Sequence, residues 1–164
     1  MPSTKDIPRI LTSRAAAYAD SHTHERFLAT GGWEGLRKAL GMRPEDVSAE
    51  VMTANLLGRG GAGFEAGKKW SLVRKGPTTR YLVVNGDESE PATFKDNLLI
   101  EREPHQLVEG TIIASYATHV SYAVIYIRGE MALGLERVQQ AVNDAYAHGA
   151  LGENIFGSGF SLDI

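Results

Sequence analysis

The sequence predicts an α/β fold in which helices flank a parallel sheet. Two short apolar runs, residues 81–85 and 123–127, have the length and composition of strands that are buried on both faces. Segments in which apolar residues recur at helical spacing lie between these runs and after them. Residues 160–164 have the composition expected at the start of a third strand. Because strands and helices alternate along the chain, a parallel sheet with crossover helices is the arrangement that fits.

The first part of the chain has a different character. Residues 1–30 are polar, are interrupted by proline and serine, and show little periodicity. We expect them to form an extended or loosely helical N-terminal arm. An α/β domain then occupies residues 31–164, and we expect it to be incomplete at its carboxyl end because the chain stops within the predicted third strand.

Two helices are predicted before the first strand. Trp33, Leu36 and Leu40 recur at helical spacing, and Gly41 ends that segment. Pro44 stands where a first helical position is expected, so a second helix runs from there to about residue 57.

Further helices follow the first strand. Thr93 and Asp96 stand in capping-box register and predict a helix that begins just before residues 98–100. Pro104 begins another helix. The last helix is stopped by Gly149 and carries an apolar stripe, which consists of Leu135, Val138, Val142 and Ala145.

The composition is that of a soluble globular protein, with 43% hydrophobic and 23% charged residues. A net charge of -3 gives no general attraction to nucleic acid or to anionic membranes. No apolar run is long enough to span a bilayer and the start lacks a signal peptide, so we expect a cytoplasmic protein without direct membrane insertion. The absence of cysteine excludes disulfides, a thiolate nucleophile and a cysteine-ligated metal centre in this chain.

The five histidines do not cluster in the sequence, so each is expected as a separate surface or helix-end residue. The sequence shows no candidate Ser/His/Asp group. We therefore expect no catalytic side chain and no metal site. The expected role of the polar residues is to bind a cofactor.

A glycine-dense loop covers residues 58–67, and its first six residues match the dinucleotide-binding pattern G-x-G-x-x-G. That pattern requires a strand before it, whereas the preceding segment is predicted to be helical, which disfavours an ordinary Rossmann first turn. The glycines would still let backbone N–H groups approach an anion or a flat ring.

Side chains in and after the glycine loop also suit a nucleotide. Arg59, Lys68 and Lys69 suit phosphate, and Phe64 offers a face for stacking on a base. A mobile linker is the alternative, and Phe64 and Trp70 so near the glycines argue against it.

An acidic loop, residues 85–91, follows directly after the first predicted strand. Ligands of open α/β sheets bind beyond the carboxyl ends of the strands, so this loop is well placed for binding. Its three carboxylates, amide and hydroxyl can accept hydrogen bonds from ribose or ribityl hydroxyls. A divalent-metal site and a solvated turn are the alternatives, although the spacing is not that of a calcium-binding loop.

Both loops resemble segments of one known family. Residues 57–64, with Gly67, Lys69 and Trp70, resemble the glycine-rich segment of the NADH-binding flavoprotein subunit of complex I. Related subunits occur in NAD-reducing hydrogenases and NAD-dependent formate dehydrogenases. Residues 80–91, with Lys95 and Asp96, resemble the family's second segment, and the similarity runs from about residue 30 to the last residue.

The resemblance implies a Rossmann-like domain that binds FMN and NADH or NAD. It implies that the glycine loop with Lys69 contacts FMN and shapes the NADH pocket, and that Phe64 stacks on adenine. It also places Asn85, Asp87 and Ser89 on the flavin side and Glu90 beside the nicotinamide nucleotide. The full set of implied binding residues is Gly58, Arg59, Gly60, Gly61, Ala62, Gly63, Phe64, Gly67, Lys69, Asn85, Asp87, Glu88, Ser89 and Glu90.

The activity implied by the resemblance is oxidation of NADH by hydride transfer to FMN. Electrons then pass to the iron–sulfur clusters of partner subunits in a respiratory NADH-quinone oxidoreductase, which holds this subunit at the membrane periphery. No side-chain acid or base is needed, because the flavin carries the chemistry and the protein positions it. The alternatives are a truncated or non-catalytic nucleotide-binding or assembly module, or the equivalent subunit of an NAD-linked hydrogenase or formate dehydrogenase.

The chain departs from the family pattern in composition and in length. Glu65 and Ala66 replace a proline and a small hydroxyl residue, and Leu72 stands where some members have an aromatic residue, which predicts weaker adenine stacking. The family continues into a second flavin-contacting segment, a ubiquitin-like domain and a helical region whose cysteines hold a [4Fe–4S] cluster. We therefore expect this sequence to represent the N-terminal part only, with a shortened paralogue of structural role as the alternative, and the isolated chain to be inactive.

Overall fold

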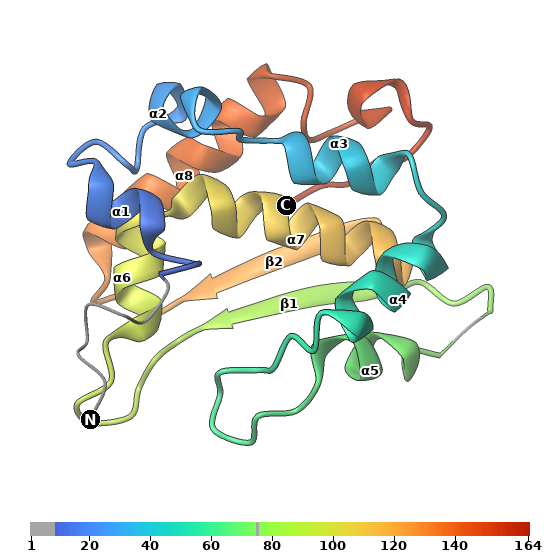
Figure 1. Cartoon of the computed structure of the whole chain (residues 1–164), viewed down its shortest axis with the longest axis horizontal. Helices are drawn as coiled ribbons and strands as arrows, with labels where there is room; N and C mark the ends of the chain where they lie inside the picture. The colour runs from blue at the N-terminus through green and yellow to red at the C-terminus, as the bar shows by residue number, and fades with distance from the viewer. Residues whose placement is uncertain (1–8, 75) are drawn as a thin grey trace.

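A computed structural model describes residues 9–74 and 76–164, which form a parallel sheet with flanking helices (Figure 1). Strand β1 (Tyr81–Gly86) pairs in parallel with β2 (Tyr122–Ile127), with Tyr81 opposite Tyr122 and Gly86 opposite Ile127. The predicted α/β class is confirmed. The helices are α1 (Ser13–Ala17), α2 (His24–Ala29), α3 (Glu34–Leu40), α4 (Pro44–Thr53), α5 (Ala66–Ser71), α6 (Lys95–Arg102), α7 (Pro104–Thr118), α8 (Ala132–Ala147) and the short 3-10 helix η2 (Ile155–Gly157).

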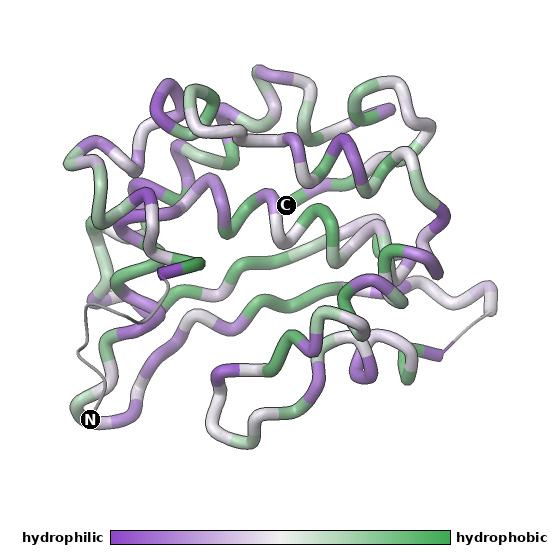
Figure 2. The backbone as a smooth tube through the Cα atoms, viewed as in Figure 1, coloured by the Kyte–Doolittle hydropathy of each residue, from purple (hydrophilic) through white to green (hydrophobic). Residues whose placement is uncertain are grey.

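The hydrophobic core lies between one face of the sheet and the helices packed on it. Ala123 is buried, and Leu82 and Ile125 pack against the same cluster. Helix α7 contacts β2 and α8, and α6 contacts β1. Figure 2 shows hydrophobic residues along both strands. The largest fully buried apolar side chains of this core are Trp33, Phe27, Leu36, Ile112, Ile155, Leu162 and Val108.

The opposite face of the sheet is exposed. Tyr81 and Val83 of β1 are 66% and 63% exposed, and Tyr122, Val124 and Tyr126 of β2 are also exposed. The prediction of strands buried on both faces is therefore wrong for the described residues. The physical reason is that helices cover only the face formed by the alternate residues, whereas parallel sheets are usually covered on both faces.

The predicted third strand forms only in part. The Ala123 amide donates to the Asp163 carbonyl at 2.8 Å, and Tyr122 and Asp163 form an isolated parallel bridge. Leu162 instead forms an antiparallel bridge with Gly152. Residues 160–164 thus pair with the beginning of β2 without extending the sheet along its length.

The N-terminal arm is not extended. Its described part forms the short helices α1 and α2, and Phe27 of α2 is 1% exposed within the main core. The Arg14 guanidinium pairs with the buried Glu103 carboxylate at 2.5 Å. Of the two forms expected for the arm, the described part therefore has the helical form and not the extended one. The first eight residues of the predicted arm lie outside the described part of the chain, and the boundary at residue 30 stays a prediction.

The helix ends follow the sequence signals in most places. Pro44 and Pro104 occupy the first turns of α4 and α7, and Gly41 caps α3 as predicted. Helix α4 ends at Thr53 instead of near residue 57, because Asn55 adopts a left-handed conformation with φ of 49°. Among the described helices, none is long and apolar enough to cross a bilayer.

Candidate flavin and nucleotide site

The glycine loop connects α4 to the short helix α5. Its two ends are held together by backbone hydrogen bonds, from the Gly58 amide to the Phe64 carbonyl and from the Ala66 amide to the Leu56 carbonyl, both 2.8 Å. Because a helix precedes the loop and α5 packs on that helix, the loop is not an ordinary Rossmann first turn. The prediction made from the sequence on this point is confirmed.

The loop and α5 enclose a cavity of about 350 Å³. A Cβ atom built at Gly60, Gly61 or Gly63 meets no other heavy atom within 4 Å, so the backbone there is open to a ligand. Gly61 and Gly63 also adopt φ values of 108° and 62°, which side-chain-bearing residues disfavour. The cavity is lined by Gly58, Gly60, Ala62, Gly63, Phe64, Ala66, Lys69 and Trp70.

One of the three predicted cations, Lys69, and the predicted aromatic ring line this cavity, whereas Arg59 and Lys68 do not. Lys69 lines it from α5, and Phe64 is 47% exposed. The Lys68 ammonium lies 5.8 Å from the centroid of the Phe64 ring. An exposed ring beside two lysines is suited to a base and a phosphate of the same nucleotide.

Gly67 has a different role from the other glycines of the loop. A Cβ atom there would lie 2.6 Å from the Met52 backbone nitrogen and 2.7 Å from its Cα. Gly67 therefore permits α5 to pack closely on α4, and this packing places Lys69 and Trp70 at the cavity.

The acidic loop follows β1 and presents its polar groups on two sides. Asn85, Ser89 and Glu90 are exposed, and Asp87 is partly exposed. The Asp87 amide donates to Asn85 Oδ1 at 3.0 Å, and the Ser89 hydroxyl donates to the Asp87 carboxylate. This outer side is available to ligand hydroxyls.

Glu88 points to the inner side and caps α6. Its carboxylate accepts hydrogen bonds from the Asp96 and Asn97 amides. The capping box predicted from Thr93 and Asp96 is wrong, since the Thr93 hydroxyl donates instead to the Glu90 carbonyl. No local sequence signal marks the actual cap, because Glu88 lies eight residues before the first amide that it binds.

The structure does not place the two loops in one cavity. The residues that line the glycine-loop cavity all come from that loop and α5. Figure 1 shows both loops in the lower part of the molecule, with the acidic loop at the carboxyl end of β1. A ligand that contacts both loops would have to extend beyond the glycine-loop cavity.

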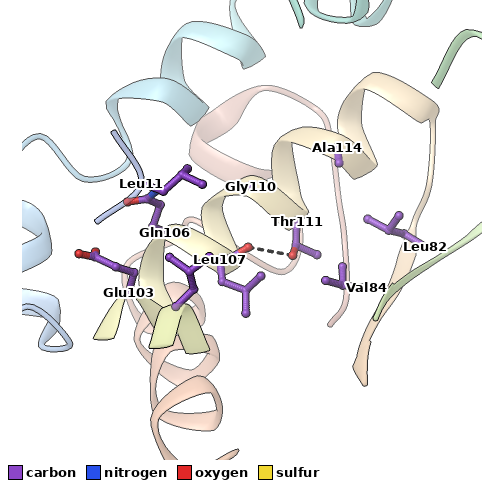
Figure 3. A pocket seen from close by; sticks show the side chains of 10 residues that line it. Leu11, Leu82, Val84, Glu103, Gln106, Leu107, Gly110, Thr111 and Ala114 are labelled. Carbon is purple, nitrogen blue, oxygen red and sulfur yellow. Dashed lines mark hydrogen bonds between the residues drawn. The ribbon is translucent and has the colours of Figure 1, made fainter. Parts of the chain in front are cut away.

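A separate apolar groove of about 300 Å³ lies between β1 and α7 (Figure 3). Leu82 and Val84 of β1 form one wall, and Gly110 and Ala114 of α7 form the other. The groove contains none of the predicted binding residues. Its apolar lining does not suit a phosphate or a ribityl chain.

Three of the histidines gather in space, so the expectation of five separate histidines is wrong. His24 stacks on His105, which is buried, with ring centroids 5.2 Å apart, and His148 meets His24 edge-on at 5.2 Å. Trp33 Nε1 donates to His24 Nε2 at 3.1 Å, and His105 Nε2 lies 2.9 Å from Asp144 Oδ2. The sequence carries no signal for this cluster, because only the packing of the helices brings these rings together. The described residues include no metal-ligating group of three or more His, Asp or Glu.

Comparison with known proteins identifies the family. Residues 51–162, more than half of the chain, match the family described as the Nuo51 FMN-binding domain. The chain belongs to this family. The matched segment contains the glycine loop, both strands and the acidic loop, so the resemblance inferred from those two loops is confirmed.

Relatives in this family include subunits of two kinds of complex. The chain is 50% identical, over its whole length, to an NADH-quinone oxidoreductase subunit of Aquifex aeolicus, of which it covers 40%. It is 51% identical over 88% of its length to the subunit of the same name in Streptomyces coelicolor, of which it covers 32%. The NADP-reducing hydrogenase subunit HndC of Solidesulfovibrio fructosivorans is 40% identical over 94% of the chain, which spans 31% of that protein.

A solved structure supports the same relationship. A chain in the crystal structure of NAD+-reducing [NiFe]-hydrogenase in the H2-reduced state superposes with a TM-score of 0.62 and 36% sequence identity. The match covers 68% of this chain and 19% of that one. The chain therefore spans well under half the length of each of these relatives.

Proposed function

We propose that this chain forms part of an electron-input flavoprotein that oxidises NADH by hydride transfer to FMN. Electrons then pass to iron–sulfur clusters in partner subunits of an NADH-quinone oxidoreductase, with the subunit cytoplasmic and peripheral to the membrane. The observation that carries the proposal is the glycine-lined cavity, because its open backbone occurs within the part of the chain that matches an FMN-binding family.

The residues present fit a flavin mononucleotide and a nicotinamide dinucleotide. Gly60 and Gly63 line the cavity and leave space that any Cβ atom would partly fill, which suits the close approach of a flat ring. Arg59 and Lys69 supply positive charge for phosphate. The exposed outer side of the acidic loop supplies acceptors for ribityl and ribose hydroxyls, from Asn85, Asp87, Ser89 and Glu90.

The work of these side chains is to bind and orient. When bound, FMN supplies the hydride acceptor and the single-electron donor. The protein must hold the donor carbon and the accepting nitrogen roughly 3–3.5 Å apart. Phe64 would fix the adenine end of NADH by stacking, and Glu90 would lie beside the nicotinamide end. No described side chain needs to transfer a proton for this step.

The equivalent subunit of an NAD-linked hydrogenase is the second candidate. The relatives named as hydrogenase components favour it, because their similarity to the chain covers most of its length. Both candidates assign the same cofactors to the same residues. They differ in the terminal electron acceptor of the complex. The residues of the flavin site do not determine that acceptor.

The test uses Gly61→Val in the full-length protein, assembled with its partner subunits. A β-branched residue resists the φ of 108° and so changes the path of the loop at Gly60 and Ala62, which line the cavity; we therefore expect loss of FMN and of NADH–ferricyanide turnover. Gly149→Val is the matched control, since Gly149 has a φ of 72° and equally open surroundings but ends α8. Flavin absorbance and turnover are measured for both variants. Stoichiometric FMN in Gly61→Val, or equal loss in Gly149→Val, would contradict the proposal.

A further inference from the structure

Glu88 differs from its neighbours in the acidic loop by its burial. Its side chain is 1% exposed, whereas Asn85, Ser89 and Glu90 are exposed. Its backbone has a φ of 47°, a left-handed conformation that is uncommon for a residue with a side chain. The contacts of the side chain must therefore stabilise this conformation of the loop.

Both carboxylate oxygens of Glu88 bind the first turn of α6. Oε1 accepts from the Asp96 amide at 2.7 Å, and Oε2 accepts from the Asn97 amide at 2.8 Å. The residue at the N-cap position, Phe94, makes no side-chain capping bond, so Glu88 satisfies amides that the helix leaves unpaired. Negative charge at this end of a helix is also favoured by the helix dipole.

The ionised form of Glu88 is the form that suits this position. Burial raises the pKa of the carboxyl, but the hydrogen bonds from the Asp96 and Asn97 amides and the charge of Lys95 outweigh it, and the pKa lies below its usual value. The carboxylate is therefore charged at neutral pH and accepts from both amides at once.

Glu88 is also tied to the segment that follows β2. Arg128 Nη1 donates to the Glu88 carbonyl at 3.4 Å, while the same guanidinium pairs with Glu130. One residue thus links the carboxyl end of β1, the start of α6 and the carboxyl end of β2. A link between rigid elements fixes the loop between them.

We propose that Glu88 is a positioning residue, whose buried carboxylate holds the acidic loop so that Asp87, Ser89 and Glu90 face the flavin and the nucleotide. The proposal rests on the proposed function and deepens it. It also replaces the direct contact with the cofactor that the family resemblance implied for Glu88. A side chain that is almost fully buried, with both oxygens bound to amides, has no surface left for a ligand.

The first experiment is hydrogen exchange on the full-length protein in its complex, with and without FMN. If Glu88 is a positioning residue, the Asp96 and Asn97 amides are protected equally in both states of the wild type. They lose protection in Glu88→Gln, because the glutamine amide cannot accept from both backbone groups. Loss of protection when FMN binds to the wild type would show that Glu88 leaves the helix to contact the flavin, which would overturn the proposal.

The second experiment separates positioning from a purely structural role. Glu88→Gln and Glu88→Ala are compared with Glu90→Gln by FMN titration and by NADH–ferricyanide kinetics at saturating FMN. Loss of charge-assisted hydrogen bonds should raise the Kd for FMN roughly 10- to 100-fold in Glu88→Ala and less in Glu88→Gln. At saturating FMN, we expect both Glu88 variants to show a raised KM for NADH and an altered visible circular dichroism of the flavin.

In the second experiment, one outcome would refute the positioning role of Glu88. If Glu88→Gln melts at a lower temperature but keeps wild-type KM, kcat and flavin dichroism, the residue serves stability alone. If Glu88→Ala fails to assemble, the kinetics and the hydrogen-exchange pattern of Glu88→Gln still test the positioning role. A wild-type complex without FMN would instead contradict the proposed function, which distinguishes that failure from failure of the Glu88 proposal.

Discussion

Replacing Gly67 with alanine tests the packing that builds the glycine-loop cavity. The added Cβ atom would lie 2.6 Å from the Met52 nitrogen, 2.7 Å from its Cα and 2.8 Å from its Cβ. Two of these atoms belong to the backbone of α4, so a change of side-chain rotamer cannot relieve the contact. Helix α5 must move away from α4, and it must carry Lys69 and Trp70 with it.

The expected loss of stability follows from two opposing effects. Overpacking of this kind destabilises a protein by about 1–3 kcal/mol. Alanine favours a helix over glycine by up to about 1 kcal/mol, and a position in the first turn of a six-residue helix gains less than that. The overpacking therefore dominates, and a net loss of about 1–2 kcal/mol should lower the melting temperature by roughly 2–8 °C for a chain of this size.

Urea unfolding and thermal melting of the chain measure this loss. Gly60→Ala is the matched control, because its Cβ atom meets nothing within 4 Å and its φ is not positive. We expect Gly60→Ala to stay within about 0.5 kcal/mol of the wild type. The reasoning fails if Gly67→Ala unfolds at the same urea concentration as Gly60→Ala, because α5 would then not be held against α4 as described.

Two further predictions concern the histidines and the exposed face of the sheet. Burial lowers the pKa values of His24 and His105, so the unfolded chain binds more protons and stability falls as the pH drops below about 6.5. His24→Gln keeps an acceptor for Trp33 and should show a shallower fall in melting temperature between pH 7.5 and 5.5, whereas an equal slope would exclude His24 as a cause. Residues 1–164 expressed alone should self-associate through the exposed sheet face and bind FMN weakly without NADH–ferricyanide turnover, because a site with few contacts offsets little of the association entropy. Sedimentation velocity should show less association for Val83→Thr with Tyr126→Thr, and a monomeric wild type with micromolar FMN binding would contradict this expectation.

Local signals predicted the elements that depend on short-range physics. The strands around Val83 and Ile125 were found from composition, and the starts of α4 and α7 from proline, because these preferences act over a few residues. The glycine loop was found because its backbone freedom depends on the residue types alone. The sequence does not mark the end of α4, because the residue that adopts the left-handed conformation there is Asn55 and not a glycine.

Interactions between residues far apart in the chain could not be predicted from the sequence, and the reason is the same for each of them. Glu88 and α6, Arg14 and Glu103, and the stacked rings of His24 and His105 each join segments that only the folded chain brings together. Carboxylates and imidazoles carry no periodicity that reveals a partner dozens of residues away. Their burial is permitted only where such a partner exists.

The sequence by itself determined the α/β class, the positions of the two loops and the residue types that a flavin and a nucleotide require. The tertiary structure decided which glycines are open to a ligand and which serve packing, because a Cβ atom at Gly60 meets nothing within 4 Å whereas one at Gly67 would meet the backbone of α4. It also decided that Glu88 turns inward while Asp87 and Ser89 remain outside. Chemistry is a property of the side chain, whereas access and orientation depend on atoms supplied by distant parts of the chain.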